Sequence, residues 1–290
     1  MTPGRHDPVA DVVLYAAGGG MRGIFGAGAL HALAETGLRG QVCAVYGLSA
    51  GAFNGALFAQ GTTIRAMEWY LHHIPSRGIL ARATAVALLR GEDMVDVTEA
   101  ERVLAAERLV DGEALSRCAV PVRFGAVDRD SLEFHWLDAR RLDAIRVLLA
   151  SSTIFPFVHE GVVIDGVTYI DGGYREGICY ARLRREHPDA RLMLVLNDSE
   201  QESVVRRAAA GAVIRLRDER LAEAWLDTFD RSQGELAEAL AEPRTLVLRP
   251  DEGFPVHLAT TDPAVLAHGF WLGYRAVLTQ RERLRAFLAA

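Results

Sequence analysis

Hydrophobic and polar residues are grouped along the chain in a way that predicts alternating strands and helices. Residues 11–17 form a short apolar run, rich in β-branched residues and bounded by glycines, which is typical of a buried strand. Residues 23–36 then show a helical pattern that stops at a glycine. A second buried strand is expected at 42–46, followed by a helix of small residues that extends to about residue 60.

The later part of the chain continues this alternation and adds hairpins. An Asp-Gly turn signal lies between two apolar runs, so residues 162–173 are expected to form a hairpin. Residues 62–108 are helical in pattern but irregular, with a proline break. The other expected elements are a hairpin of 120–127 and 131–136, a helix at 140–150, a strand at 192–196, a charged helical stretch at 202–242 that contains more than one helix, a strand at 245–248 and a helix from 263 to the end.

This order of elements predicts an α/β fold. Strands that alternate with helices favour a largely parallel central sheet, and the hairpins add antiparallel strands to it. No repeat, low-complexity tract or clear linker divides the sequence. We therefore expect residues 1–290 to form a single domain.

Composition narrows the class of protein. Apolar residues make up 50% and charged residues 24% of the chain, which is typical of a globular protein. The net charge of −6 argues against nucleic acid as the main partner. Residues 1–11 lack the apolar segment of a secretory signal, and no run approaches the ~20 apolar residues that span a bilayer. Cys43, Cys118 and Cys179 are far apart, which predicts reduced thiols in a cytoplasmic protein without a metal site.

A glycine-rich loop follows the first predicted strand, in the segment YAAGGGMRG. Gly18, Gly20 and Gly23 have the spacing of a dinucleotide-binding loop. Such a loop also requires an acidic residue about 20 positions later, at the end of the second strand, whereas Glu35 falls within the helix. A nucleotide-binding oxidoreductase is therefore a weak alternative. The loop amides are free to bind another anion at the start of the helix.

The second predicted strand ends in Gly47-Leu48-Ser49-Ala50-Gly51. This G-x-S-x-G sequence between a strand and a helix predicts a nucleophile elbow, in which a sharp turn exposes the serine hydroxyl. The amides at the start of the following helix favour developing negative charge at the same place. In a parallel sheet both loops meet at the carboxyl edge, so the glycine loop is expected to stabilise the oxyanion formed when Ser49 attacks an acyl group.

A serine nucleophile requires a base, and the sequence offers two kinds. His257 and His268 lie where the histidine of a Ser-Asp-His triad of an α/β hydrolase would stand. Asp171, in YIDGGYREG, directly follows an apolar strand and precedes two glycines. A free aspartate has a pKa of ~3.9, so Asp171 serves as a base only if burial raises its pKa. We therefore expect Asp171 to lie in a partly dry crevice beside Ser49.

Together these motifs resemble the ordered signature of the patatin-like phospholipases. The resemblance rests on the glycine loop at 18–23, the Gly47–Gly51 segment and Asp171-Gly172-Gly173, at spacings that fit the family. LLASSTIFPF at 148–157 is similar to the Ala-Ser-rich segment before the aspartate. The core signature covers about 12–184 and leaves an extension of about 185–290, in which residues 253–276 resemble a bacterial subgroup.

The resemblance implies a three-layer α/β/α sandwich with a mostly parallel sheet, and a serine acyl hydrolase that needs no metal or other cofactor. It implies hydrolysis of acyl esters of phospholipids or lysophospholipids by a Ser49–Asp171 dyad through an acyl-enzyme. Gly47 and Gly51 would flank the nucleophile, and Arg22 would help to hold the glycine loop. The residues implied for the oxyanion hole are Gly18, Gly19, Gly20, Met21, Arg22 and Gly23. A catalytically idle binding protein remains a third alternative.

Two segments depart from the common pattern of the family. Residues 153–157 read Thr-Ile-Phe-Pro-Phe where Ile-Pro-Gly is usual, and residues 174–178 replace an Asn-Pro stretch after the aspartate. Both would affect the choice of substrate more than the chemistry. Because the implied substrates are lipids, a transient membrane surface is an expected partner. Residues that could form an apolar rim or lid near the site are Trp69, Tyr70, Leu71, Ile74, Ile79 and Leu80. The alternative is that they are ordinary core residues.

Overall fold

The computed structural model describes residues 10–80, 93–154, 158, 160–198, 211–216 and 218–289. Its strands are β1 (Val12–Ala16), β2 (Val42–Leu48), β3 (Val122–Asp128), β4 (Phe134–Asp138), β5 (Val162–Ile164), β6 (Val167–Asp171), β7 (Arg191–Val195) and β8 (Thr245–Leu248). Its α-helices are α1 (Gly23–Glu35), α2 (Ala50–Gln60), α3 (Ile74–Ser76), α5 (Val97–Ala106), α6 (Gly112–Ser116), α7 (Ala144–Ser152), α8 (Tyr180–Glu186), α10 (Glu219–Ala241), α11 (Pro263–Thr279) and α12 (Arg281–Ala289). Short 3₁₀ segments are η1 (Gly20–Arg22), η2 (Leu38–Gln41), η3 (Thr63–Arg65) and η5 (Gly172–Tyr174), and η4 (Glu68–His73) is a π-helix.

The described strands form one eight-stranded sheet in the order β5-β6-β3-β2-β1-β7-β8, with β4 also paired to β3. The pairs β3–β2, β2–β1, β1–β7 and β7–β8 are parallel, whereas β4, β5 and β6 add antiparallel pairs. Both predicted hairpins are confirmed. In the β5–β6 turn, Asp165 and Gly166 have positive φ angles of 50° and 84°, the backbone that an Asp-Gly turn provides.

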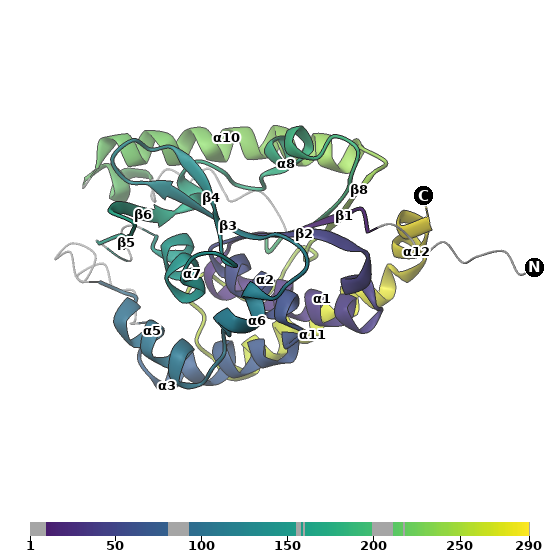
Figure 1. The fold of residues 1–290 in the computed structure, drawn as a ribbon, viewed down its shortest axis with the longest axis horizontal. Helices are drawn as coiled ribbons and strands as arrows, with labels where there is room; N and C mark the ends of the chain where they lie inside the picture. Colours follow the sequence, from purple (N-terminus) through teal and green to yellow (C-terminus); the bar gives the residue numbers. More distant parts are fainter. Residues whose placement is uncertain are drawn as a thin grey trace, which may run out of the picture.

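Helices cover both faces of the sheet, which confirms the expected three layers. Figure 1 shows α8 and α10 on one side and α1, α2, α7 and α11 on the other. The parallel strands between them are almost wholly buried; β1 reads Val-Val-Leu-Tyr-Ala without one exposed residue. Such continuous apolar runs are typical of a parallel sheet that is covered on both faces.

The first and the penultimate helices cross in backbone contact. A Cβ added to Gly28 of α1 would lie 1.9 Å from the carbonyl oxygen of Phe270, and one added to Gly273 of α11 would lie 1.9 Å from that of Phe25. Only glycine permits this approach at either position. The crossing fixes the C-terminal part of the chain to α1, the helix that begins at the glycine loop.

Two predicted boundaries are wrong by a few residues. The second strand continues to Leu48 because Gly47 and Leu48 still pair with β3, so β2 runs directly into the serine turn. The helix expected from residue 140 begins at Ala144. The Asp143 carboxylate caps it by accepting hydrogen bonds from the N–H groups of Ile145 and Arg146. The long charged stretch contains α10 and a short helical segment at 211–215, and residues 202–210 lie outside the described part.

Candidate active site

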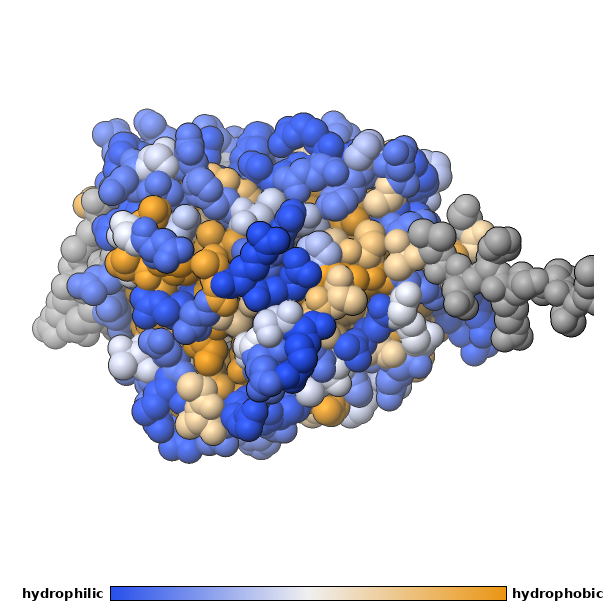
Figure 2. Space-filling model, viewed as in Figure 1, coloured by the Kyte–Doolittle hydropathy of each residue, from blue (hydrophilic) through white to orange (hydrophobic). Residues whose placement is uncertain are grey.

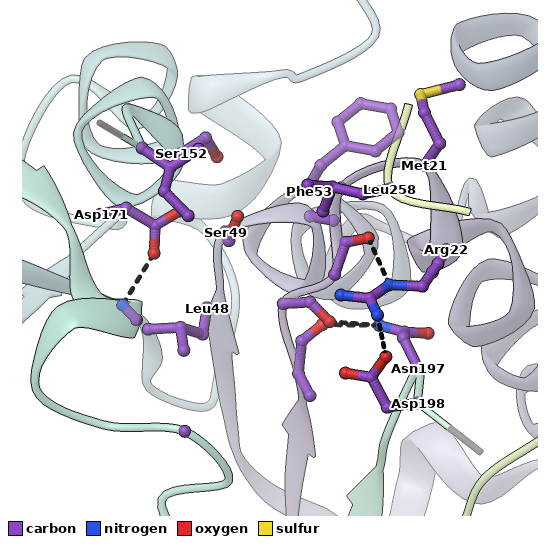
Figure 3. Close-up of a pocket in the computed structure, with 18 of the residues that line it drawn as sticks. Met21, Arg22, Leu48, Ser49, Phe53, Ser152, Asp171, Asn197, Asp198 and Leu258 are labelled. Carbon is purple, nitrogen blue, oxygen red and sulfur yellow. Dashed lines mark hydrogen bonds and ion pairs between the residues drawn. The ribbon is translucent and has the colours of Figure 1, made fainter. Parts of the chain in front are cut away.

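The register of β3 brings the predicted serine and aspartate together. Leu48, the last residue of β2, pairs with Gly125, and Asp171, the last residue of β6, pairs with the next residue, Ala126. Because β2 is parallel and β6 antiparallel to β3, the two strands end facing each other. Ser49 therefore follows one strand end while Asp171 closes the other, and their side chains lie across a short gap in Figure 3.

Ser49 occupies a strained turn. Its φ of 53° and ψ of −126° lie in a region that residues with a side chain rarely adopt. A Cβ on Gly51 would lie 2.0 Å from the carbonyl oxygen of Ala16, and one on Gly47 would lie 2.6 Å from that of Gly51. The backbone thus packs too closely for any other residue at these two positions, which is the expected geometry of a nucleophile elbow.

A buried serine braces the turn. The Ser49 N–H donates to the hydroxyl of Ser151 at 3.0 Å, and that hydroxyl donates to the carbonyl oxygen of Gly125 at 2.6 Å. Ser151 is fully buried near the end of α7, within the Ala-Ser-rich segment. It therefore links the serine turn to β3, the strand that also pairs with Asp171.

The Asp171 carboxyl is desolvated, as expected. It is 1% exposed, and burial raises its pKa to about 6, while the Gly173 N–H and then the Ser49 hydroxyl act in the opposite direction. Oδ1 accepts a 2.7 Å hydrogen bond from the Gly173 N–H. Oδ2 is buried and accepts no hydrogen bond within the described structure. With a pKa of about 6 the carboxyl is mostly ionised at neutral pH, and one of its oxygens is available to accept a proton.

The glycine loop packs against the serine. A Cβ on Gly18 would lie 3.1 Å from the Cβ of Ser49 and 3.8 Å from its Oγ. Only part of the loop has free amides, however. The Met21 N–H donates to Leu258 at 3.0 Å, the Arg22 N–H donates to Gly19 at 3.1 Å, and the Gly23 N–H donates to Gly20 and Met21. Among the described residues of the loop, the N–H groups of Gly18, Gly19 and Gly20 remain without a partner.

Two residues from the end of β7 hold this loop. The buried Asn197 amide donates to the carbonyl oxygens of Ala17 at 2.7 Å and Gly18 at 3.0 Å, and its oxygen accepts from the Gly26 N–H at 2.9 Å. Arg22 donates through Nε to Gly19 at 3.2 Å and forms an ion pair with Asp198. The sequence analysis misses Asn197 and Asp198, although a polar pair directly after a buried strand marks the carboxyl edge of the sheet.

Ser49 and Asp171 lie in the wall of a cavity of about 390 Å³ (Figure 3). Most of the lining side chains are apolar, and α2, η4, α5, α7 and α10 each contribute some of them. On the face shown in Figure 2, hydrophobic residues reach the surface between α10 above and α5 below, over α7 and β6. The site can therefore accommodate an extended apolar group next to the serine.

The residues expected to form an apolar rim are mostly buried. Exposed fractions are 8% for Trp69, 2% for Tyr70 and 2% for Ile79, and Leu71 and Ile74 are also buried. Most of the set lines the cavity from inside, and Leu80 is half-buried. Of the two possibilities, an exposed rim or buried core, the structure supports the buried one: most of these side chains form an inner wall of the cavity.

The two histidines considered as bases lie elsewhere. His257 and His268 are exposed, and neither lines the cavity. No histidine is found among the described residues that line it. The geometry therefore does not support the histidine triad.

Comparison with known proteins identifies the fold and the family. The model of the family described as patatin-like phospholipase matches residues 14–180, more than half of the chain. This chain belongs to the patatin-like phospholipase family. The match includes the glycine loop, Ser49 and Asp171, and it ends before Asn197.

Comparison with solved structures finds one with the same overall fold. VipD from Legionella pneumophila superposes with a TM-score of 0.52 at 14% identity, over 94% of this chain and 66% of VipD, so the chain spans just under two thirds of that protein. The ExoU-SpcU complex of the type III secretion system of Pseudomonas aeruginosa has 19% identity over 96% of this chain and 60% of the other, with a TM-score of only 0.29. The comparison with curated proteins found no match.

Two segments depart from the usual patatin-like pattern. The structure describes the first only in part and the second in full. Phe155, Pro156 and Phe157 lie outside the described residues. After the aspartate, the carbonyl oxygen of buried Tyr174 accepts from Thr228 at 2.8 Å, and a Cβ on Gly177 would lie 1.9 Å from the hydroxyl oxygen of Ser232. This second segment therefore packs closely on α10.

Among the described residues, no group of three His, Cys, Asp or Glu side chains is placed to hold a metal ion. In the same part of the chain, no helix has the length and apolar character needed to cross a bilayer. All three cysteines are free.

Proposed function

We propose that this protein is a serine acyl hydrolase that cleaves fatty-acyl esters of phospholipids or lysophospholipids. One observation carries the proposal: Ser49, in a strained turn, faces a buried carboxyl of Asp171 inside a largely apolar cavity. A patatin-like phospholipase has a lipid ester as its natural class of substrate, and the apolar cavity wall supports an acyl chain at this site.

In the proposed first step, Ser49 Oγ attacks the ester carbonyl carbon while its proton passes to Oδ2 of Asp171. The free amides of Gly18, Gly19 and Gly20 stabilise the tetrahedral oxyanion, and the N-terminus of α2 adds a favourable dipole. Collapse of this intermediate breaks the bond to the alcohol, which takes the proton from Asp171 as it leaves. The acyl group remains bound to Ser49.

In the second step, a water molecule attacks the acyl-Ser49 carbonyl and gives its proton to Asp171. The tetrahedral intermediate then expels Ser49 Oγ, which recovers the proton, and the free fatty acid departs. The partial exclusion of water suits both steps, because a carboxylate with a raised pKa is a stronger base than one in solvent. The reaction needs no other titratable group than Asp171.

The proposal extends to where the enzyme works. Lipid substrates reside in bilayers or micelles, so we propose a cytoplasmic protein that contacts a membrane surface transiently. The surface hydrophobic residues between α10 and α5 offer one route from such a surface to the cavity.

Labelling with a long-chain fluorophosphonate, read by intact mass, tests the function. We expect one adduct on the wild-type protein, none on Ser49→Ala and slow labelling of Asp171→Asn. Hydrolysis of a panel of phospholipids and lysophospholipids follows on the same three proteins. An unlabelled wild-type protein, with and without liposomes or detergent, would favour the binding-protein alternative.

A further inference from the structure

Among the described residues, the cavity contains an arginine without a partner. Of the two arginines that line its described part, Arg22 is ion-paired with Asp198, whereas Arg249 makes no hydrogen bond or ion pair. Arg249 directly follows β8 and is half-buried. A guanidinium is always charged and presents several donors in one plane, so a half-buried one without a carboxylate is available to an anion.

The strand order gives Arg249 a defined place relative to Ser49. The ends of β2, β1, β7 and β8 are neighbours at the carboxyl edge, and they carry Ser49, the glycine loop, Asn197 and Arg249 in that order. With about 4.8 Å between strands, the backbone of Arg249 lies roughly 14 Å from that of Ser49. The Arg249 side chain lines the same cavity as Ser49, and a long arginine side chain can cover part of the distance between the two backbones. The remaining distance suits the short polar linker between an ester and an anionic group.

Part of the apolar lining lies toward the opposite end of the sheet from Arg249. Leu148 and Leu149 line the cavity from α7, which packs on β3, β5 and β6, and Ala100 lines it from α5, which packs on α7. A substrate with its ester over Ser49 thus meets apolar side chains toward α7 and α5, and toward β8 an arginine without a carboxylate partner among the described residues. This polarity fits a molecule with an acyl chain at one end and an anion at the other.

We propose that Arg249 binds the phosphate of a phospholipid substrate whose acyl ester lies over Ser49. The inference rests on the proposed function and adds a residue that selects among acyl esters. In a glycerophospholipid only a few bonds separate the ester from the phosphate, so both groups fit along the row of strand ends. The glycine loop then binds the oxyanion between them.

The test compares lysophosphatidic acid with monoacylglycerol of the same acyl chain, in the same nonionic detergent micelles. For Arg249→Gln, we expect the ratio of kcat/KM for the phosphate lipid to kcat/KM for the neutral lipid to fall about tenfold or more. Arg249→Lys keeps the charge and is expected to retain most of the ratio. Arg275→Gln, which removes an exposed arginine of α11, is the matched control and keeps the wild-type ratio. An unchanged ratio for Arg249→Gln overturns the proposal.

A binding measurement separates this proposal from the catalytic one. An ether-linked lysophosphatidic acid cannot be hydrolysed, so its Kd, compared with that of the matching alkylglycerol, depends on recognition alone. We expect Arg249→Gln to weaken binding of the ether phosphate about tenfold and to leave the preference of Arg275→Gln unchanged. If the wild-type protein is neither labelled by the fluorophosphonate nor active in ester hydrolysis, the Kd of the ether phosphate still tests the phosphate site. An equal Kd for wild type and Arg249→Gln overturns that site.

Discussion

The Asp171 carboxyl ends β6 in a buried position, and burial raises its pKa to about 6. A general base acts only when it is ionised. We therefore expect kcat/KM to rise with pH up to about 6 and to remain level above it, and Asp171→Asn to lose a factor of about 10²–10⁴. The pH dependence of ester hydrolysis measures both effects.

A histidine base would produce a similar pH profile, so the control is to replace His257 and His268 by Ala, singly and together. Both side chains are exposed and lie outside the cavity. Their variants are expected to keep the wild-type rate and profile. Loss of activity in either would contradict the role given to Asp171.

The same carboxyl is expected to reduce the stability of the fold at neutral pH. Its pKa is higher in the folded state than in the unfolded chain, so the folded protein binds more protons between pH of about 4 and 6 and its stability falls as pH rises through that window. Asp171→Asn should raise the free energy of unfolding at pH 7 by on the order of 2–3 kcal/mol. Urea denaturation measures it. Below a pH of about 4 the difference should vanish, and a variant that is less stable at pH 7 would contradict the expectation.

Ser49 is expected to reduce stability through its backbone. At φ 53° and ψ −126° a glycine is unstrained, whereas any side chain costs about 1–3 kcal/mol, partly offset by the flexibility of glycine in the unfolded chain. Ser49→Gly should therefore unfold at a higher urea concentration than Ser49→Ala, by a free energy of about 1 kcal/mol. Both variants lack the hydroxyl, so equal stability would argue against strain in the turn.

At the scale of elements, the crossing of α1 and α11 depends on close approach. A Cβ at Gly28 would lie 1.9 Å from a backbone oxygen of α11, which cannot move away as a side chain could. Gly28→Ala is expected to lower the free energy of unfolding by about 3 kcal/mol, measured by urea denaturation. Gly40→Ala is the control, because nothing lies within 4 Å of its added Cβ. Comparable stability of the two variants would show that the helices can separate without cost.

Elements with strong local signals could be predicted from the sequence. The pattern predicts α1, α2 and both hairpins because apolar periodicity and turn residues act over a few positions. The pattern places the start of α7 at residue 140, four residues too early, because Asp143 caps the helix and residue 144 is its first residue. The sequence alone leaves open whether the apolar residues of η4 form a rim or an inner wall, since periodicity does not reveal which apolar residues a distant helix will cover.

At the scale of the whole molecule, the candidate site combines motifs with contacts that no motif announces. Gly18–Gly23, Ser49 and Asp171 are visible in the sequence because tight turns require particular residues. Asn197 is not, because its contact with Ala17 joins residues 180 positions apart and exists only when β7 pairs with β1. Arg249 is not predicted from the sequence either, because its place in the cavity depends on the pairing of β8 with β7.

The cavity as a whole should set the preferred acyl length. Ala100 lines it from α5, and a larger side chain there would occupy part of the space for the end of a long chain. Ala100→Leu is expected to lower the ratio of kcat/KM for a palmitoyl ester to that for a butyryl ester several-fold, with both esters measured side by side. The exposed neighbour Ala105→Leu is the control. If the two variants keep the same ratio, the acyl chain does not reach α5.

The contacts that hold the glycine loop also have a consequence for biosynthesis. Asn197 and Leu258, which bind the loop, lie well beyond the serine and the aspartate in the chain. A nascent polypeptide can form the elbow early, because N-terminal segments fold first as they leave the ribosome. On this geometry the glycine loop stays unsupported until residue 258 has emerged, well after Ser49 and Asp171 have been synthesised.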